Sequence, residues 1–379
     1  MAGGAGTRFW PISSDELPKQ FLDILNCGRT LIQLTFDRFK GLIPTENVWV
    51  VTVEKYRDLV KMQLPEIPEE NIQCEPCRRN TAPCICYASW KIKKRNAKAN
   101  VVVTPADHLV LDTQAFQEAI DDSLSFAAET DAIVTLGLKP TRPETGYGYI
   151  KADLGYSSSR KQNIFRVDEF KEKPTLEVAQ EYVKQPNYLW NSGIFIWNVN
   201  TIINAFRVYE PSISQVFEDL LPIYDQPNEQ RCIEEKYEQC ENISVDYAIL
   251  EKAEEIFVFP AAFAWSDLGT WNSLREQSEK DKYGNVSMGE HIKLFDTYNT
   301  IVHTCGKKEV VIQGLDGYVV AEKDGRLLIC KLSEEQRIKL FHWKYWSKGI
   351  LNELIPFLKG GIYRVFKKYG AAFWYLLNR

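Results

Sequence analysis

The residues best suited to chemistry stand at the start of the chain, where residues 1–10 read MAGGAGTRFW. Glycines let a backbone approach an anion closely, so that successive N–H groups can point at a phosphate. Arg8 adds a permanently charged bidentate donor, and Lys19 in the later PKQF segment adds a second cation. The segment therefore predicts a phosphate-binding loop, with these candidate nucleotide contacts: Gly3, Gly4, Gly6 and Thr7.

The spacing of these glycines matches neither of the two common nucleotide-binding patterns. It lacks the Gly-Lys-Ser/Thr ending of a Walker loop and the order of glycines in a dinucleotide fingerprint. On glycine content alone, a flexible terminus is an equal alternative.

Two aspartates are candidates for holding a metal ion. Asp107 directly follows the apolar run NVVVTP at 100–105, and Asp267 lies in WSDLGT. A carboxylate at the end of a buried strand suits Mg²⁺, which prefers one or two carboxylates together with phosphate oxygens and water. A helix N-cap at Asp107 and a turn residue at Asp267 remain as alternatives.

Four cysteines raise the alternative of a zinc site. Cys74, Cys77, Cys84 and Cys86 are enough in number for zinc, but they lie on both sides of the RNTAP segment at 79–83. This arrangement favours separate buried thiols over a zinc site.

The elements that must position these residues alternate between strands and helices over the first two-thirds of the chain. Residues 48–53, 100–105 and 132–138 are β-branched runs typical of buried strands, and residues 29–42 and 113–129 have helical periodicity. We therefore expect an α/β fold with a Rossmann-like, doubly wound, mixed but mainly parallel sheet over residues 1–282. Ligands of such sheets bind beyond the carboxyl ends of the strands.

The C-terminal third has a different pattern. Short strands separated by Asp-Gly and Gly turns predict a small all-β domain at 283–340. Residues 341–379 form a basic, aromatic tail in which 342–379 carry seven Lys/Arg and one acidic residue. If this tail forms a helix, the helix can lie on an anionic membrane. A helix docked on the body and an extension without function are the alternatives.

Composition narrows the class of protein further. The net charge of −5 argues against a nucleic-acid binder, and no apolar stretch is long enough for a membrane span or a signal peptide. An odd number of cysteines, nine, suits a reducing cytoplasm. The composition leaves a homodimer open.

Eight short motifs, in a consistent order, resemble those of one enzyme family. The segments AGGAGTRFWPIS with LPKQF, EPCRRNTAP, TPADH, ETGYGYI, FKEKP, WNSGIFIW, SVDYAILEKA and WSDLGTW resemble the signature of the sugar-1-phosphate nucleotidylyltransferases. Trp10-Pro11 and Pro-Lys-Gln-Phe resemble its mannose-1-phosphate guanylyltransferase branch. The resemblance extends over residues 1–335.

The resemblance implies an activity and a set of partners. A phosphate oxygen of mannose 1-phosphate attacks the α-phosphorus of GTP, giving GDP-mannose and pyrophosphate with Mg²⁺ as cofactor. Because two polyanions must meet, cations and positioning dominate such catalysis. Another NTP or hexose 1-phosphate, and a non-catalytic homologue that senses nucleotide sugars, are the alternatives.

The resemblance also assigns roles to residues. It implies that Asp107 and Asp267 hold the metal, and that Arg79 and Asn80 lie near the base. The residues that it implies for catalysis are Arg8, Lys19, Asp107 and Lys173. Those that it implies for the sugar are Gly146, Glu172 and Asn191.

Family members carry a hydrophobic strand before the glycine loop, whereas only Met1 precedes it here. We therefore expect either that the natural chain is longer or that the sheet lacks a central strand, with lower stability and nucleotide affinity.

Overall fold

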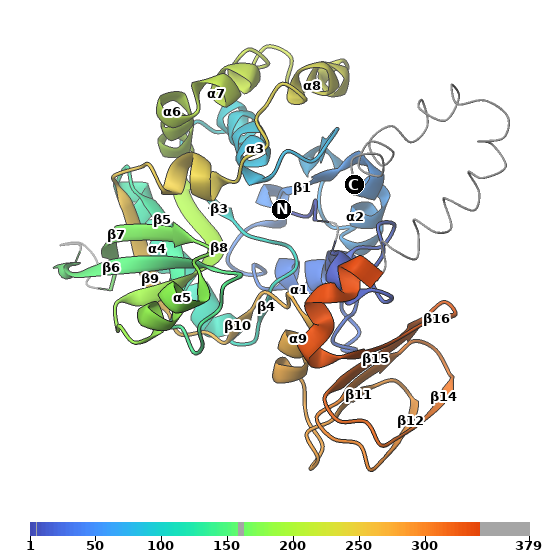
Figure 1. The fold of residues 1–379 in the computed structure, drawn as a ribbon. Helices are drawn as coiled ribbons and strands as arrows, with labels where there is room; N and C mark the ends of the chain where they lie inside the picture. Colours follow the sequence, from blue (N-terminus) through green and yellow to red (C-terminus); the bar gives the residue numbers. More distant parts are fainter. Residues whose placement is uncertain (5, 158–162, 342–379) are drawn as a thin grey trace, which may run out of the picture. The chain divides into compact units, whose positions relative to one another are not determined.

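The computed structural model describes residues 1–4, 6–157 and 163–341, which divide into two compact units (Figure 1). The first unit contains residues 1–6 and 15–268. The second contains residues 7–14 and the chain from residue 269 onward. Each unit is described below by itself.

A six-stranded mixed sheet forms the centre of the first unit, in the order β3-β8-β5-β9-β7-β6. Its strands are β3 (Asn100–Val103), β5 (Ile133–Leu138), β6 (Gly148–Ser157), β7 (Phe165–Glu172), β8 (Tyr188–Asn198) and β9 (Ile256–Ala261). Five of the six pairings described in this sheet are antiparallel, and only β5 and β9 run parallel. The prediction of a mainly parallel sheet is therefore wrong for these strands, because β8 inserts antiparallel between β3 and β5.

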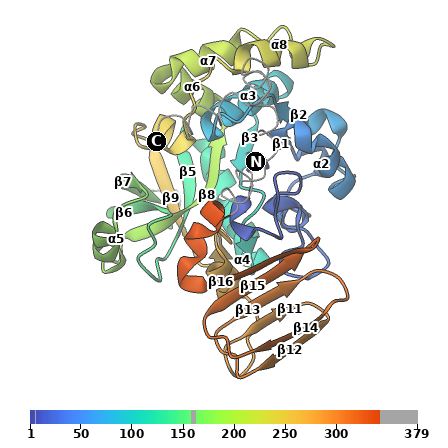
Figure 2. The same ribbon diagram turned by 45° about the vertical axis from the view of Figure 1, so that its right-hand side comes forward.

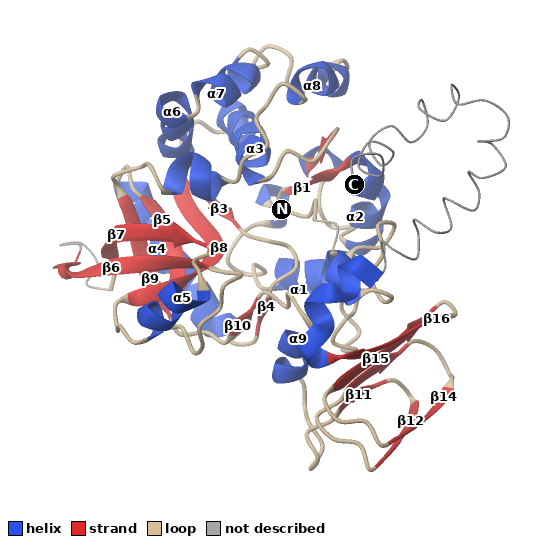
Figure 3. Ribbon diagram, viewed as in Figure 1, coloured by secondary structure: helices blue, strands red, loops and turns tan. Residues whose placement is uncertain are grey.

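Helices cover both faces of this sheet, as an α/β fold requires (Figure 3). On one face, Phe116 of α4 (Thr113–Glu129) shares a buried cluster with Ile196 of β8. On the other, Trp197 packs in a cluster with Trp90 of α3 (Thr81–Arg95) and Phe206 of α6 (Val199–Tyr209). The other helices of this unit are α1 (Leu31–Asp37), α2 (Arg57–Gln63), α5 (Leu176–Val183), α7 (Pro211–Glu218), α8 (Glu229–Tyr237) and a π-helix, η6 (Asp246–Leu250).

Two short parallel strands lie beside the start of the chain. These are β1 (Val50–Val53) and β2 (Ile72–Glu75). The Ala2 N–H donates to the carbonyl of Val51 at 2.8 Å. Met1 donates its ammonium to the Thr104 carbonyl at 2.9 Å and accepts from the Ala106 N–H at 3.0 Å. Residues 1 and 2 therefore join β1 to the segment that follows β3, and the glycine loop leaves from between them.

A two-stranded antiparallel ribbon joins two distant motifs of the first unit. Leu109 of β4 (Leu109–Val110) pairs with Ser266 of β10 (Trp265–Ser266). Asp107 lies just before one of these strands and Asp267 just after the other. Because the strands run antiparallel, the two aspartate-bearing segments meet at the same end of the ribbon.

The second unit consists mainly of stacked short strands (Figure 2). Its strands are β11 (Val286–Met288), β12 (His291–Phe295), β13 (Ile301–Thr304), β14 (Glu309–Gln313), β15 (Tyr318–Lys323) and β16 (Arg326–Lys331). β11, β13 and β15 pair in parallel, as do β12 and β14, so successive strands alternate between two sheets. β16 closes this stack as a hairpin with β15, in which Asp324 and Gly325 both adopt positive φ, as a type I′ turn requires.

Two further elements belong to the second unit. They are α9 (Trp271–Gln277) and a 3₁₀ turn, η1 (Thr7–Phe9). The Phe9 ring contacts that of Trp271 edge to face, with 5.1 Å between centroids. A segment from the start of the chain is thereby built into this unit.

Among the described helices, none combines the length and apolar character needed to cross a bilayer. Residues 342–379 lie outside the described residues. The expected membrane contact of the basic tail therefore stays a prediction.

Candidate active site

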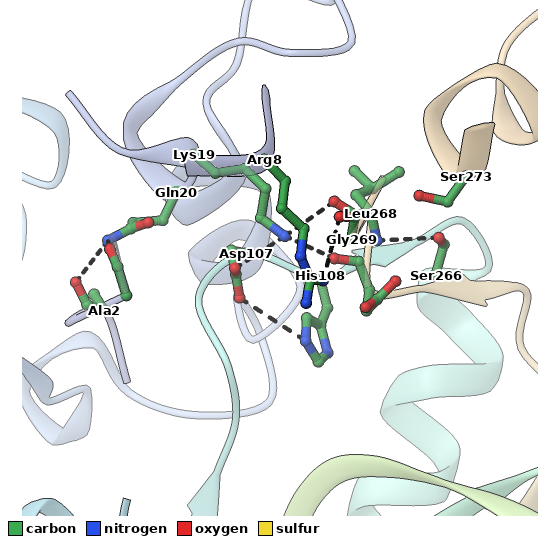
Figure 4. A network of polar contacts seen from close by, with 12 residues as sticks. Ala2, Arg8, Lys19, Gln20, Asp107, His108, Ser266, Leu268, Gly269 and Ser273 are labelled. Atoms are coloured by element: carbon green, nitrogen blue, oxygen red, sulfur yellow. Dashed lines mark hydrogen bonds and ion pairs between the residues drawn. The ribbon is translucent and has the colours of Figure 1, made fainter. Parts of the chain in front are cut away.

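The glycine loop is anchored through its carbonyl groups. Gln20 Nε2 donates to the carbonyls of Ala2 at 2.8 Å and Gly4 at 2.9 Å (Figure 4). Arg78 Nε donates to the carbonyl of Gly3 at 2.8 Å. Within the described residues, no hydrogen bond uses the N–H of Gly3 or Gly4. This pattern suits a loop that offers its amides to an anion.

Gly6 must be glycine for two independent reasons. Its φ is +57°, in the left-handed region that favours glycine. A Cβ at this position would lie 2.6 Å from the backbone N of Lys19 and 2.8 Å from its Cβ. The loop is thus packed directly against the 3₁₀ turn η2 (Lys19–Phe21).

Lys19 connects three segments of the first unit. Its side chain is buried, and Nζ lies 2.9 Å from Asp107 Oδ2. Nζ also donates to the main-chain carbonyls of Asp267 at 2.7 Å and Leu268 at 3.2 Å (Figure 4). The structure therefore brings together three of the predicted site segments, those of Lys19, Asp107 and Asp267.

Asp107 is held in an ionised state. Burial alone would raise the pKa of its carboxyl, but the Lys19 ammonium and, to a smaller extent, His108 lower it below its usual value. Arg38 fixes the neighbouring peptide by donating from Nη2 to the His108 carbonyl at 2.6 Å. The His108 ring packs edge to face on Trp265, and burial lowers its pKa. The contacts of the adjacent residue His108 therefore hold the backbone that carries the Asp107 carboxylate in place.

The Asp267 carboxylate is oriented by a tyrosine. Tyr147 donates a hydrogen bond from its hydroxyl to Asp267 Oδ1 at 2.8 Å. Burial, and to a smaller extent the Asp267 carboxylate, raise the pKa of the Tyr147 phenol. Within the described part of the chain, no group of three or more His, Cys, Asp or Glu side chains is placed to hold a metal ion. Cys74, Cys84 and Cys86 are buried free thiols.

A second polar cluster gathers where the end of β7 lies near the first half of β8. Asn191 Nδ2 donates to Asp246 Oδ1 at 3.0 Å, and Asn191 Oδ1 accepts from the Gly193 N–H at 3.0 Å. Glu172, which is largely buried, forms an ion pair with the adjacent Lys173. Burial and the nearby Glu172 raise the pKa of Asp246 to about 6. The predicted sugar residues Glu172 and Asn191 therefore belong to one cluster.

Gly146, the third predicted sugar residue, lies beside this cluster and not in it. Its N–H donates to Glu144 Oε1 at 3.1 Å, in the loop before β6. Gly148, two residues later, is the glycine that faces the cluster, because a Cβ there would lie 2.4 Å from Glu172 Oε2 and 3.3 Å from the Asn191 Cβ. The structure thus brings Glu172, Lys173 and Asn191 together and leaves Gly146 in the adjoining loop.

The predicted base contacts are at the start of α3. Asn80 is the N-cap of this helix, and its Oδ1 accepts from the Thr81 N–H at 3.0 Å. Arg79 donates from Nη2 to the Glu238 carbonyl at 2.9 Å. Arg79 Nε is buried and has no hydrogen-bond partner in the described parts of the chain.

The remaining loop residues belong to the second unit. Arg8 is exposed, and its Nη1 donates to the Gly269 carbonyl at 3.4 Å. Thr7 begins η1.

Four residues that sequence reasoning did not select carry contacts in these clusters. They are Gln20, Arg78, Tyr147 and Asp246. All four stand inside the motifs LPKQF, EPCRRNTAP, ETGYGYI and SVDYAILEKA. The signal that could have identified them is that each is a hydrogen-bonding side chain within one of these motifs.

Comparisons with known proteins agree with this arrangement. The family model described as "Nucleotidyl transferase" matches residues 1–283. Mannose-1-phosphate guanylyltransferase of Escherichia coli (strain K12) is 36% identical over 368 residues, which cover 92% of this chain and 76% of that protein. The xanthan biosynthesis protein XanB of Xanthomonas campestris is 34% identical over 342 residues, covering 89% of this chain and 71% of that protein.

A solved structure is also similar. The crystal structure of a Thermus thermophilus protein named mannose-1-phosphate geranyltransferase aligns with a TM-score of 0.81 at 31% identity. The alignment covers 91% of this chain and 97% of that one.

The chain belongs to the nucleotidyl transferase family. It is an enzyme of this type, and the resemblance to the mannose-1-phosphate guanylyltransferases that its motifs indicated is confirmed.

Proposed function

We propose that this enzyme transfers GMP from GTP to mannose 1-phosphate, giving GDP-mannose and pyrophosphate. The observation that carries the proposal is the meeting of Lys19, Asp107 and the Asp267 main chain beside a glycine loop whose carbonyls are anchored elsewhere. The names of the relatives that are 34–36% identical support the choice of base and sugar.

The triphosphate of GTP would bind at the loop. The amides of Gly3 and Gly4 and the backbone of Gly6 would surround its oxygens, and the Lys19 ammonium would supply positive charge. Thr7 and Arg8, which belong to the second unit, stay predicted phosphate contacts, since guanidinium matches phosphate geometry. An oxygen of mannose 1-phosphate would then attack the α-phosphorus and expel pyrophosphate, so no protein nucleophile is needed.

The acidic residues fit a magnesium ion. Asp107 is ionised, because Lys19 holds the pKa of its carboxyl below its usual value despite burial. Asp107 and Asp267 carry the oxygens that Mg²⁺ prefers, and two carboxylates with phosphate oxygens and water would complete its coordination. When bound, the ion would neutralise charge that develops on the phosphates. Tyr147 would keep the Asp267 carboxylate oriented.

The polar cluster of Glu172, Asn191 and Asp246 would bind the sugar. Glu172 and Asp246 offer carboxyl oxygens to sugar hydroxyls, and Asn191 lies beside Asp246 as both donor and acceptor. Lys173 would neutralise the phosphate of mannose 1-phosphate. Its side chain is 59% exposed and therefore accessible to a ligand. Gly146 would let the loop backbone approach the sugar.

Base recognition is proposed at the start of α3. Arg79 keeps a buried, unpartnered Nε among the described residues, and the Asn80 amide group lies next to it in the chain. A guanine offers both donors and acceptors on its edge, which suits such a pair. A different NTP or hexose 1-phosphate remains the second candidate within the same chemistry.

We further propose that residues 1–282 form the catalytic domain, residues 283–340 a small β domain and residues 341–379 a helical tail. A cytoplasmic location is proposed on the nine cysteines, all of which are free thiols. A homodimer and membrane contact by the tail are further proposals.

Pyrophosphate release tests the function. Purified protein is incubated with mannose 1-phosphate, Mg²⁺ and each of GTP, dTTP, UTP, CTP and ATP in turn. We expect release with GTP above all others. Folded protein that binds GTP and mannose 1-phosphate without releasing pyrophosphate would indicate the sensing homologue, and turnover with another NTP would reassign the base.

A further inference from the structure

The Lys19 ammonium is coordinated much as a bound cation would be. Nζ lies 2.9 Å from Asp107 Oδ2, 2.7 Å from the Asp267 carbonyl and 3.2 Å from the Leu268 carbonyl. An ammonium has three N–H donors, and these three oxygens are enough to accept all of them. The side chain is only 7% exposed, so water contributes little to its solvation.

This environment differs from that of the other proposed phosphate-binding lysine. The Lys173 side chain is 59% exposed and pairs with the adjacent Glu172. A lysine that only awaits a phosphate can remain hydrated in this way, because its long stem reaches the ligand when needed. Lys19 is instead enclosed by acidic and carbonyl oxygens from two distant segments.

We infer that Lys19 is the resident cation of the substrate-free enzyme and competes with the divalent metal for Asp107. It neutralises one of the two carboxylates proposed to hold the metal and occupies one of the oxygens, Asp107 Oδ2. The inference rests on the proposed function in one respect: the phosphate oxygens of the nucleotide draw the Lys19 ammonium away from Asp107.

One consequence concerns the order of binding. A free divalent ion must displace a buried ammonium before it can use Asp107 Oδ2, so it binds weakly to the protein alone. GTP supplies anions for Lys19 and further ligands for the metal at the same time. The metal therefore enters productively with the nucleotide rather than before it.

Binding of Mn²⁺ alone to the nucleotide-free enzyme, followed by electron paramagnetic resonance of free Mn²⁺, tests this competition. An opposite charge at this distance shifts the proton affinity of a carboxylate by roughly 10- to 1000-fold, so Lys19→Met should bind Mn²⁺ at least about tenfold more tightly than the wild type. The matched control is Lys184→Met, which removes a lysine from an exposed 2.7 Å pair with Glu181 and should leave Mn²⁺ affinity unchanged.

Two results of this titration would overturn the inference. One is a Lys19→Met variant, folded by circular dichroism, that binds Mn²⁺ no more tightly than the wild type. The other is a gain in affinity that survives in Lys19→Met/Asp107→Asn, because the extra binding would then not involve Asp107.

A second comparison does not depend on the folding of a Lys19 variant. The Asp107 side chain holds Lys19, whereas Asp267 holds it through its main-chain carbonyl. Asp107→Asn and Asp267→Asn each remove one negative charge, but only the first releases the ammonium. We therefore expect Asp107→Asn to bind GTP more tightly in EDTA than Asp267→Asn does; equal affinities would refute the competition.

These readouts are separate from catalysis. If no NTP supports pyrophosphate release but Lys19→Met still gains Mn²⁺ affinity through Asp107, the proposed function fails and the competition stands. If turnover with GTP is observed without that gain, the function stands and the competition fails.

Discussion

Gly4 and Gly6 of the loop lead to different predictions for the same substitution, which isolates the role of backbone geometry. In Gly6→Ala, the new Cβ would meet the Lys19 backbone N at 2.6 Å, and φ at this position is +57°. In Gly4→Ala, the Cβ would meet nothing within 4 Å, and φ is not in the left-handed region. The pair shares one loop, one unit and one chemical change.

The expected loss for Gly6→Ala has two parts. The left-handed conformation costs an alanine about 1–2 kcal/mol, and overpacking against a neighbour that cannot move aside costs about 1–3 kcal/mol more. The clashing atoms are backbone N and Cβ of a buried residue, so the second part should not be relieved cheaply. We expect the free energy of unfolding to fall by about 2–5 kcal/mol in Gly6→Ala and to change by no more than about 1 kcal/mol in Gly4→Ala. In Gly4→Ala, alanine reduces the number of conformations of the unfolded chain, which favours the folded state.

Urea unfolding followed by circular dichroism, with GTP binding measured in parallel, checks this difference. The Gly6→Ala midpoint should fall well below those of the wild type and Gly4→Ala. Gly4→Ala should keep its stability and bind GTP more weakly, because a methyl group beside the Gly4 amide would hinder the close approach of the proposed phosphate. Equal midpoints for the two variants would refute the assignment of Gly6 as a structurally required glycine.

Three further predictions concern acidic residues and their partners. Burial raises the pKa of Glu75 to about 7 although the Tyr237 hydroxyl donates to it, so its contribution to stability is full below pH 4.5 and is lost as pH rises through 7. This shift corresponds to about 3 kcal/mol of unfolding free energy. Glu75→Gln should therefore make the urea midpoint less dependent on pH between pH 5 and 8, and an unchanged pH dependence would contradict the prediction. Asp107→Asn should abolish metal-dependent pyrophosphate release while leaving the circular dichroism spectrum intact, and substantial residual activity would exclude it as a metal ligand. Tyr147→Phe should lower kcat roughly tenfold by removing a hydrogen bond to a carboxylate, the 2.8 Å bond to Asp267, and raise the Mg²⁺ concentration for half-maximal rate; an unchanged Mg²⁺ dependence would oppose this role.

Local sequence signals predicted some elements closely. The helix expected at 113–129 is α4 with those same bounds, because its apolar period is regular and Asp112 caps it through the Ala115 N–H. The helix expected at 29–42 is shorter, since α1 ends at Asp37. Arg38 then turns inward to bind the His108 carbonyl, a contact between residues 70 positions apart that no local pattern contains.

Strand direction was beyond the reach of the same signals. β8 is buried on both faces, with Ile196 in one cluster and Trp197 in the other, and its residues 194–197 form an apolar run. Such runs are typical of parallel strands, but the cause is burial on two faces rather than direction. No strand was expected at 188–198, and hydropathy could not show that β8 runs antiparallel to β3 and β5.

The partners of the site residues follow from topology in the same way. The β4-β10 ribbon brings Asp107 to the segment of Asp267. The end of β7, the first half of β8 and the start of η6 bring Glu172, Asn191 and Asp246 together. A charged group of one motif would be costly to bury without a partner from elsewhere. The sequence motifs identify which groups are present, but their ionisation and orientation depend on pairings between segments that only the folded sheet supplies. This dependence explains why Asp107, beside Lys19, has a lowered pKa, while Asp246, which is buried and lies near Glu172, has a raised one.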